Sequence, residues 1–512
     1  MPSSPVLRTA SILATAALIA AATLASAGNA QAHDACPARA TCGTVTVPLD
    51  RADPSGATLA VAYAFVPRTD LTHASLGVVA PNPGGPGVST IGQAELYSTL
   101  MAPLLTRRDL LLVDARGTGR SGAIRCAWPS PTTPLLETPS SLGGRCIAPL
   151  GKRATNYGSA DVADDLDAIR ASLGIDRLDL WGDSYGTFLM PVYAARHPQH
   201  VRSIVLDGAF PVAFDPWGRD VLAGTRRVLT LACRRARTCS GPTVLRQVAR
   251  LARQLRRHPI TVRIPTPAGS IQVTAGERDL AEVVHAAGDP QRLRWVPVAV
   301  DEALHGDRRR LRQLIIASRT SDAQGATVDP ELFSLGAAAA VSCHDYPRAF
   351  SLAATPAERR LAYARALAAL PSSSFAPFSA DAWLSTDIDA GPKCIDWPVD
   401  PTAGSPLAGL TMPSVPVLVQ SGDLDSNTPI EQGRAAAAQF PAATFAVSKN
   451  AGHTPDLQPC GVAQAIRFVE RLHVDPESCR HAGRPPRIEP VDAQSRPRRN
   501  AAISRARPTG SS

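Results

Sequence analysis

Short apolar runs alternate with longer stretches of helical spacing over much of the chain. This alternation is typical of a mostly parallel β-sheet with helices packed against it. Residues 163–173 and 187–196 have helical spacing and flank one apolar run at 178–181. We therefore expect an α/β fold with eight strands, at 43–47, 59–65, 76–80, 110–113, 178–181, 203–206, 415–420 and 444–447.

The strand pattern stops in the middle of the chain. Residues 211–400 are rich in Ala, Arg and Leu and have mainly helical spacing, which predicts a helical cap inserted into the core. The core would then comprise residues 33–210 and 401–482, with the helices on both faces of its sheet.

One stretch of the expected cap is strongly basic. Its apolar residues recur at three- and four-residue spacing, so the arginines between them would line an exposed helix face. A solvated cap helix is the favoured interpretation, and a helix lying on a membrane surface is the alternative. The apolar positions are Leu245, Val248, Leu251 and Leu255.

The two ends of the chain differ from the rest. Arg8, an apolar stretch at 9–24 and two A-x-A sites are typical of a secretory signal, which we place at residues 1–32. The apolar stretch is shorter than the roughly 20 residues that a membrane anchor needs. We therefore expect a secreted or wall-associated protein without stable membrane insertion. The Pro-, Arg- and Ser-rich tail at 483–512 is expected to be disordered.

Composition and charge narrow the classes of partner. A chain of 512 residues needs a core with a large insertion, or two domains, and 44% hydrophobic residues suit a globular protein. The net charge of +9 comes almost wholly from arginine. No nucleic-acid-binding motif accompanies the arginines, so we expect a solvated surface and no nucleic-acid partner. The sequence leaves the oligomeric state open.

The ten cysteines all follow the expected signal, and an even number favours disulfides in an exported protein. No C-x-x-C occurs, so a zinc site is not expected, and no cofactor is indicated. Sequence neighbours suggest five pairs, although spacing alone cannot fix the pairing: Cys36–Cys42, Cys126–Cys146, Cys233–Cys239, Cys343–Cys394 and Cys460–Cys479.

The candidate chemistry begins at G-D-S-Y-G, residues 182–186, between an expected strand and an expected helix. G-x-S-x-G in that context predicts a nucleophile elbow, a strained turn that exposes Ser184. Glycines flank the serine because a side chain there would collide with the neighbouring strand and helix. A loop that carries the same five letters by chance is the alternative.

A serine hydroxyl needs a base and an orienting acid, which follow the serine in the order acid, then histidine, in α/β-hydrolases. The loop after 415–420 offers Asp423 and Asp425, and the loop after 444–447 offers His453. Both loops follow strand ends, where this fold gathers its catalytic groups. We expect Asp425 as the acid, with Asp423 as a turn residue, and His453 as the base.

A tetrahedral intermediate also needs N–H donors for its oxyanion, usually two from the backbone. Tyr185 follows the nucleophile and should supply one. The strand at 76–80 runs into P-N-P-G-G-P-G, where glycines allow the backbone to approach the reacting carbon. Pro86 has no N–H, so we expect the second donor to be Gly85 rather than Gly87.

Several motifs together resemble those of prolyl aminopeptidases, and most closely those of the secreted tripeptidyl aminopeptidases of actinobacteria. They are N-P-G-G-P-G at 82–87, D-A-R-G-T-G-R-S-G at 114–122, G-D-S-Y-G-T at 182–187, D-S-N-T-P at 425–429 and A-G-H at 451–453. The likeness spans roughly residues 40–480. It implies an α/β-hydrolase fold with a helical cap and an exopeptidase that acts on free peptide or protein N-termini.

The resemblance also bears on single positions. Pro83 stands where prolyl aminopeptidases carry a histidine, a form that the tripeptidyl group commonly has. Asp114 and Arg116 are expected to brace the loop beside the elbow. Related aminopeptidases hold the substrate's ammonium with acidic cap residues; Asp345 is the candidate here, and a structural role beside Cys343 is its alternative.

The sequence thus predicts a serine exopeptidase that releases short peptides through an acyl-enzyme, with two rivals kept open. A secreted carboxylesterase or lipase would use the same triad, and fold alone does not separate the two. An acidic cavity facing Ser184 would favour the peptidase, and an apolar one the esterase. A catalytically inactive binding protein is the third reading, which predicts that Ser184 does not react with a fluorophosphonate.

Overall fold

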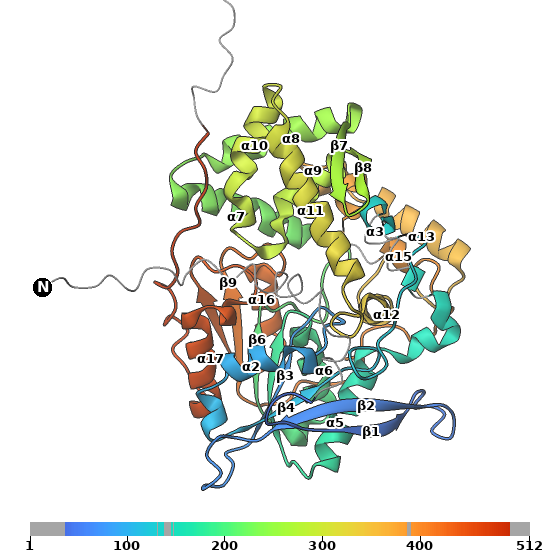
Figure 1. Cartoon of the computed structure of the whole chain (residues 1–512), viewed down its shortest axis with the longest axis vertical. Coiled ribbons are helices and arrows are strands. Elements are labelled where there is room, and N and C mark those ends of the chain that lie inside the picture. Colours follow the sequence, from blue (N-terminus) through green and yellow to red (C-terminus); the bar gives the residue numbers. More distant parts are fainter. Residues whose placement is uncertain (1–35, 131, 138–144, 147, 387–390, 492–512) are drawn as a thin grey trace, which may run out of the picture.

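The computed structural model describes residues 36–130, 132–137, 145–146, 148–386 and 391–491. The expected signal at 1–32 lies outside the described residues. An eight-stranded sheet forms the lower half of the molecule in Figure 1, and the cap lies above it.

The sheet has the order β1-β2-β4-β3-β5-β6-β9-β10. β1 and β2 pair antiparallel, as do β2 and β4, and all later neighbours pair in parallel. All eight expected strands are present, and their ends differ from the expected ones by at most two residues. In chain order the strands are β1 (Thr41–Pro48), β2 (Thr58–Val66), β3 (Val78–Asn82), β4 (Asp109–Val113), β5 (Leu178–Asp183), β6 (Val201–Asp207), β9 (Val417–Gly422) and β10 (Ala443–Ser448).

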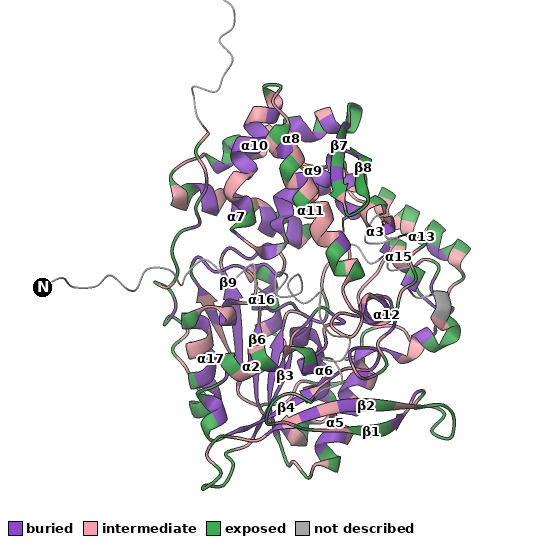
Figure 2. Ribbon diagram, viewed as in Figure 1, coloured by how far each residue is buried: buried purple, intermediate pink, exposed green. Residues whose placement is uncertain are grey.

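Helices cover both faces of this sheet because its central strands are apolar on both sides (Figure 2). In β5, Leu180 packs into the cluster with α5 (Ser159–Ser172), α6 (Gly186–Arg196) and α16 (Ile430–Ala437). Its neighbour Trp181 packs into the opposite cluster, with α2 (Ala94–Leu100) and α17 (Pro459–Arg471). The expected α/β architecture is confirmed.

The cap has its own apolar core, built mainly by five helices. It also holds an antiparallel hairpin, β7 (Ile260–Thr266) and β8 (Gly269–Ala275), which the helical reading of this stretch missed. The helices are α7 (Arg219–Ala236), α8 (Gly241–Arg257), α9 (Glu277–His285), α10 (Val296–Leu304) and α11 (Arg309–Thr327).

Shorter helices join the cap to the core. α12 (Leu335–Asp345) and α13 (Pro356–Ala368) form a separate small cluster with residues near Trp397. The other α-helices of the described residues are α3 (Thr133–Leu136), α14 (Ala380–Leu384) and α15 (Gly391–Cys394). α3 comes from the first half of the core sequence but contacts α11 of the cap.

All five suggested cysteine pairs form disulfides. Disulfides persist in oxidising compartments and are typical of exported proteins. Within the described part of the chain, none of the helices combines the length and the apolar character that a membrane crossing requires.

The prediction that the chain is unstructured from residue 483 onward is wrong for residues 483–491. Ile488 is 2% exposed and packs into the cap core. Glu489 forms an ion pair of 2.6 Å with Arg294 of the cap. One buried apolar residue and one ion pair thus fix a segment whose composition favours disorder. The rest of the predicted tail, 492–512, lies outside the described residues.

Candidate active site

Ser184 lies in a tight turn between a strand and a helix. β5 ends at Asp183 and α6 begins at Gly186, which leaves two residues for the turn. Ser184 has a φ of 53°, in the left-handed region that non-glycine residues rarely adopt. Its N–H donates to the carbonyl of Asp207 at the end of β6, at 3.0 Å. The backbone is strained here and held by its neighbour, as a nucleophile elbow requires.

The two flanking glycines are required by close backbone contacts. A Cβ on Gly182 would lie 2.3 Å from the carbonyl oxygen of Gly186. A Cβ on Gly186 would lie 2.5 Å from the carbonyl oxygen of Asn82 in the neighbouring loop. Both distances are far below van der Waals contact with atoms that cannot move aside. The G-x-S-x-G spacing is therefore demanded by the turn itself.

The structure brings Asp425, and not Asp423, to His453. Oδ2 of the fully buried Asp425 lies 2.9 Å from Nδ1 of His453, and its Oδ1 accepts the N–H groups of Asn427 and Thr428. Asp423 instead forms an ion pair of 2.5 Å with Arg235 on α7. One carboxylate thus orients the imidazole, and the other ties the cap to the loop.

Thr428 is a residue of this site that the sequence analysis missed. Its Oγ1 lies 2.7 Å from Oδ2 of Asp425 and 3.0 Å from Nδ1 of His453. It also lies 2.9 Å from the carbonyl oxygen of Gly208, beyond the end of β6. The signal was available, because Thr428 belongs to the same D-S-N-T-P loop as the acid.

His453 keeps one ring nitrogen available. Within the described residues its Nε2 is buried and has no hydrogen-bond partner. Burial lowers the pKa of His453, but the charge of Asp425 and its hydrogen bond outweigh burial, so the pKa lies above 6.5. A Cβ on Gly208 would lie 3.0 Å from His453 Cε1. The residue before Gly208 is Asp207, whose carbonyl accepts the N–H of Ser184. The imidazole and the serine therefore meet at the same end of β6.

The predicted oxyanion loop lies directly over the elbow. A Cβ on Gly84 would lie 2.8 Å from Ser184 Cβ and 3.1 Å from the nitrogen of Tyr185. The N–H of Gly84 is taken by Asn82 Oδ1 at 3.2 Å. The N–H groups of Gly85 and Tyr185 have no acceptor in the described part of the chain, and both residues line a cavity with Ser184.

That cavity has a volume of about 450 Å³ and lies between the sheet and the cap. Phe210, Phe214 and Tyr346 give it an aromatic wall. Charged side chains from the cap and from the loops beside it complete the lining. They are Glu137, Asp215, Arg278, Glu282, Arg319, Asp322 and Lys393.

The structure does not bring Asp345 to this cavity. Its carboxylate is 2% exposed; Oδ2 accepts Ser159 N–H at 2.6 Å, at the start of α5, and Oδ1 lies 2.7 Å from Nδ1 of His344. Both oxygens are thus engaged, and Oδ2 holds α12 against α5. This placement argues against Asp345 as a ligand for the substrate's ammonium and for the structural alternative.

Asp114 and Arg116 hold loops, as expected. The buried Asp114 accepts hydrogen bonds from Ser89 Oγ at 2.8 Å and from Ile91 N–H at 3.0 Å, in the segment after the oxyanion loop. Arg116 is also buried and pairs at 2.7 Å with Asp165 of α5. Neither residue lines the cavity at Ser184.

The cap is attached to the acid and base loops themselves. The N–H of His453 donates to the carbonyl of Gly288 at 2.9 Å. Ser426, next to Asp425, donates its hydroxyl to the carbonyl of His285 at 2.6 Å and accepts the N–H of Gly288 at 3.0 Å. Burial lowers the pKa of His285 to about 4, so this cavity-lining imidazole is neutral. The end of α9 therefore fixes both loops.

Three fully buried carboxyl groups lie behind the elbow. They belong to Asp183, Asp207 and Asp456, whose oxygens lie within 4.8 Å of one another. Asp183 accepts hydrogen bonds from Tyr97 Oη at 2.7 Å and Trp181 Nε1 at 3.0 Å. Trp181 Nε1 also lies 3.0 Å from Oδ2 of Asp456, and Asp456 N–H donates to Oδ2 of Asp207 at 2.9 Å. Asp183 immediately precedes Ser184, and Asp456 follows His453 by three residues.

This cluster fits shared protons better than a metal ion. Four of the six oxygens already accept N–H or O–H groups, and only Oδ1 of Asp207 and Oδ1 of Asp456 lack a partner among the described residues. Hard divalent cations need about six oxygen ligands. Burial, followed by the neighbouring Asp456, raises the pKa values of Asp183 and Asp207 well above 3.8. The three carboxyls, through Trp181 Nε1 and Asp456 N–H, therefore link the elbow to the histidine loop.

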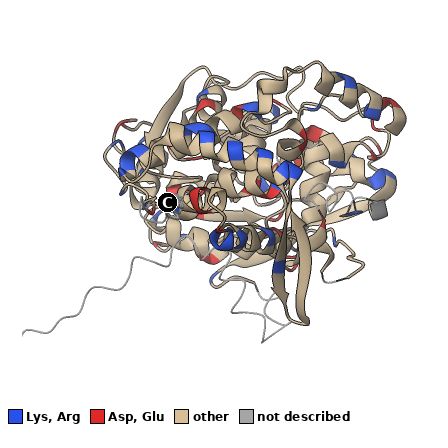
Figure 3. Ribbon diagram, turned by 90° about the horizontal axis from the view of Figure 1, so that it is seen from above, with Lys and Arg blue, Asp and Glu red and all other residues tan. Residues whose placement is uncertain are grey.

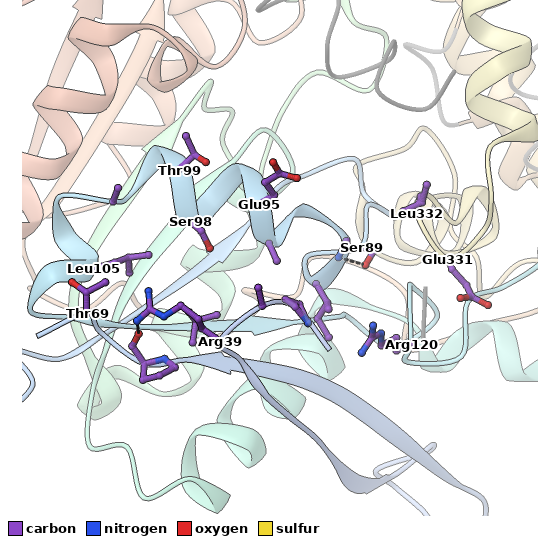
Figure 4. Close-up of a pocket in the computed structure, with 18 residues that line it drawn as sticks. Arg39, Thr69, Ser89, Glu95, Ser98, Thr99, Leu105, Arg120, Glu331 and Leu332 are labelled. Atoms are coloured by element: carbon purple, nitrogen blue, oxygen red, sulfur yellow. Dashed lines mark hydrogen bonds between the residues drawn. The ribbon is translucent and has the colours of Figure 1, made fainter. Parts of the chain in front are cut away.

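A second cavity, of about 730 Å³, contains none of the predicted catalytic residues. Figure 4 shows it between α2 and the start of the described chain, with Arg39 and Arg120 on one side and Glu95 and Glu331 around its rim. Ser89, which supports Asp114, is the link between this cavity and the oxyanion loop.

Comparison with known proteins agrees with this geometry. Residues 79–295 match the family of the alpha/beta hydrolase fold, and residues 380–479 match the family described as TAP-like protein. The chain is 37% identical over 199 residues to serine protease Hip1 of Mycobacterium tuberculosis, covering 35% of this chain and 38% of that protein.

Two further relatives bear on the activity. Tripeptidyl aminopeptidase of Streptomyces coelicolor is 32% identical over 185 residues, covering 32% of this chain and 34% of that protein. Carboxylesterase B of Mycobacterium tuberculosis is 29% identical over 197 residues, covering 35% of this chain and 37% of that protein. The matched region thus spans little more than a third of each relative's length.

Proposed function

We propose that the protein, two regions of which match the alpha/beta hydrolase fold and TAP-like families, is a serine exopeptidase that releases short peptides, such as tripeptides, from free N-termini. The observation that carries the proposal is the Asp425–His453 pair: Nε2 has no partner among the described residues, and the ring lies against Gly208, next to the Asp207 carbonyl that holds Ser184. The protease and aminopeptidase names of two relatives support the choice of peptide substrates.

The geometry suggests the following reaction. His453 Nε2 accepts the proton of Ser184 Oγ as the oxygen attacks the substrate carbonyl. The N–H groups of Gly85 and Tyr185 stabilise the oxyanion that forms. His453 then gives its proton to the departing amine, and water hydrolyses the acyl-enzyme by the reverse path. Asp425 keeps the imidazole in the tautomer with its proton on Nδ1, and Thr428 supports that carboxylate.

The shape of the cavity supports action at chain ends. The cap covers the cavity, and the loops of the triad are fastened to the cap at Gly288, so the space above Ser184 is confined. The lining carries carboxyl groups, from Glu137, Asp215, Glu282 and Asp322, and is not wholly apolar. An ammonium group is recognised by such carboxyl groups, whereas a simple ester has no charge for them to bind.

The test is hydrolysis of three substrates by the purified protein and by Ser184→Ala: a tripeptidyl amide, an aminoacyl amide and a short acyl ester. We expect cleavage of the tripeptidyl amide, a loss of at least about 10³-fold in Ser184→Ala, and fluorophosphonate labelling of the wild type alone. Cleavage of the ester without either amide would refute the peptidase proposal. Absence of labelling would favour the inactive binding protein.

A secreted carboxylesterase is the second candidate. The aromatic wall of Phe210, Phe214 and Tyr346 would accommodate an apolar acyl group, and one relative carries the name carboxylesterase B. The same three substrates separate the two candidates. An N-acetylated tripeptidyl amide adds a further control, because an exopeptidase should lose most of its activity when the amine is blocked.

We also propose that the protein is exported. The five disulfides and the signal-like residues 1–32 support this location. N-terminal sequencing of protein recovered from the culture medium tests it, with cleavage after Ala27 or Ala32 as the expected result.

A further inference from the structure

The positive charge of the chain is concentrated in one segment of the cap. Residues 221–276 contain 11 arginines and no Asp or Glu. Of the 53 Lys and Arg in the chain, the remaining 42 are outnumbered by 44 Asp and Glu. The net charge of +9 therefore comes from this segment alone, and Lys and Arg positions, coloured blue, recur along the helix ribbons seen from above the cap (Figure 3). Such asymmetry points to an anionic partner.

Four of these arginines form a line along α8, which we call the arginine stripe: Arg246, Arg250, Arg253 and Arg257. Their spacing of four, three and four residues places them on one helix face, over a length of about 16 Å. All four are exposed, and none forms an ion pair with a described residue. Exposed Arg234 and Arg237 near the end of α7, and Arg263 on β7, extend the charge beyond α8.

The nearby acids do not neutralise the arginine stripe. Glu277 is taken by Arg256, at 2.6 Å, and Asp301 of the adjacent α10 accepts a hydrogen bond from Gln247 at 2.6 Å. Like charges at i and i+4 destabilise a helix by a few tenths of a kcal/mol per pair. Repulsion within the stripe therefore works against the folding of α8, and only Arg257, in the last turn, gains from the helix dipole.

The other side of α8 shows how the helix is anchored. Val244, Val248, Leu251 and Leu255 are at most 2% exposed and pack into the cap core. They are not available to enter a bilayer, so the arginines act as a charged surface without an apolar anchor. A membrane-bound amphipathic helix needs such an anchor on its outer face.

We propose that the arginine stripe binds a linear polymer of phosphate groups, laid along α8. The guanidinium group offers a planar pair of donors that matches phosphate oxygens, and a row of four suits repeated phosphates better than a single anion. α8 contributes no residue to the cavity at Ser184. A polymer bound there would hold the protein in place and leave the cavity open to substrate.

The test compares binding of long-chain inorganic polyphosphate to the full-length protein over a range of salt concentrations. The stripe variant replaces Arg246, Arg250, Arg253 and Arg257 with Gln. The matched control replaces four exposed arginines of α13 and α17 with Gln: Arg360, Arg365, Arg467 and Arg471. Each neutralised phosphate contributes roughly 0.7 to the slope of log K against log salt, so we expect the stripe variant to lose about 3 units of slope.

The expected result is at least about a 10-fold weaker affinity for the stripe variant and a much smaller change for the control, with unchanged thermal unfolding and unchanged Ser184 reactivity in both. No measurable binding by the wild type, or equal losses in both variants, would overturn the proposal. Capture by anionic phospholipid vesicles without binding to polyphosphate would overturn it in favour of a lipid surface. All of these readouts are independent of peptide hydrolysis, so they stand apart from the proposed function.

Discussion

At the scale of single residues, the hydroxyl of Thr428 is the least expected part of the site. It lies within hydrogen-bond distance of both Asp425 and His453, and of the strand end that holds Ser184. An oxygen that touches all three segments fixes their relative positions. We therefore regard Thr428 as a positioning residue.

Replacement of Thr428 tests that role. Thr428→Val keeps the shape and removes the hydroxyl, so Asp425 loses a donor inside a buried site. A hydrogen bond to a charged group contributes about 1.5–3 kcal/mol, so we expect kcat to fall about 10- to 100-fold with KM little changed. Thr428→Ser should restore most of the activity in steady-state assays. Wild-type kcat in Thr428→Val would show that the contact is incidental.

What the sequence revealed of the site depended on motif and order. Ser184, Asp425 and His453 each follow a predicted strand end, so the G-x-S-x-G motif and the order of acid and histidine were enough to identify them. No motif contains Asp345, and the direction of its side chain could not be known before α12 and α5 were placed. Thr428 belongs to the same D-S-N-T-P motif as Asp425, but the sequence alone gives a threonine no distinctive role until its neighbours are located in space.

At the scale of elements, the buried carboxyls of Asp183, Asp207 and Asp456 connect β5, β6 and the turn after His453. Raised pKa values mean that the folded protein keeps protons that the unfolded chain releases above about pH 4. Because the folded state then binds more protons, stability must fall as pH rises from about 4 to the folded-state pKa values. The cluster therefore favours stability under acidic conditions.

Asp207→Asn isolates this effect. The amide can still accept Asp456 N–H and can donate to the unpartnered oxygen of Asp456, but it does not titrate. We expect the variant to gain stability relative to wild type as pH rises, by up to about 1.4 kcal/mol per pH unit, in urea unfolding from about pH 5 to about pH 9. Asp381→Asn, at an exposed site, serves as the control. Parallel curves for Asp207→Asn and wild type would mean that the cluster is ionised throughout.

The elements themselves were largely predictable. The eight strands of the sheet are apolar runs bounded by turn residues, and all eight were found. The cap hairpin was missed because its alternation in I-T-V-R-I, one face buried and one exposed, lies between helices of similar composition. The period of two was present in the sequence, and the surrounding helical pattern concealed it.

At the scale of the whole molecule, the disulfides differ in the length of chain that each one encloses. Cys343–Cys394 spans 51 residues and joins α12 to α15, whereas Cys36–Cys42 spans six. A longer closed loop removes more conformational entropy from the unfolded chain. The larger disulfide should therefore contribute more to stability.

Paired Cys→Ser substitutions measure that difference. Loss of Cys343–Cys394 should cost about 4 kcal/mol and loss of Cys36–Cys42 about 2 kcal/mol, from the entropy of loop closure. Denaturant unfolding of the two double variants under one set of conditions gives the comparison. Equal costs would show that strain or local contacts, rather than loop length, determine the contribution of each disulfide.

The attachment of the cap at Gly288 sets the order in which the cap folds and the site is completed. His453 and the residue next to Asp425, Ser426, are held by Gly288, which belongs to the cap at 211–400, so both loops depend on a folded cap. In a nascent or partly translocated chain the imidazole would not be aligned with Ser184, and the serine would therefore be unreactive. Folding of the cap therefore has to precede the alignment of His453 with Ser184, and the proposed hydrolysis requires a completed cap.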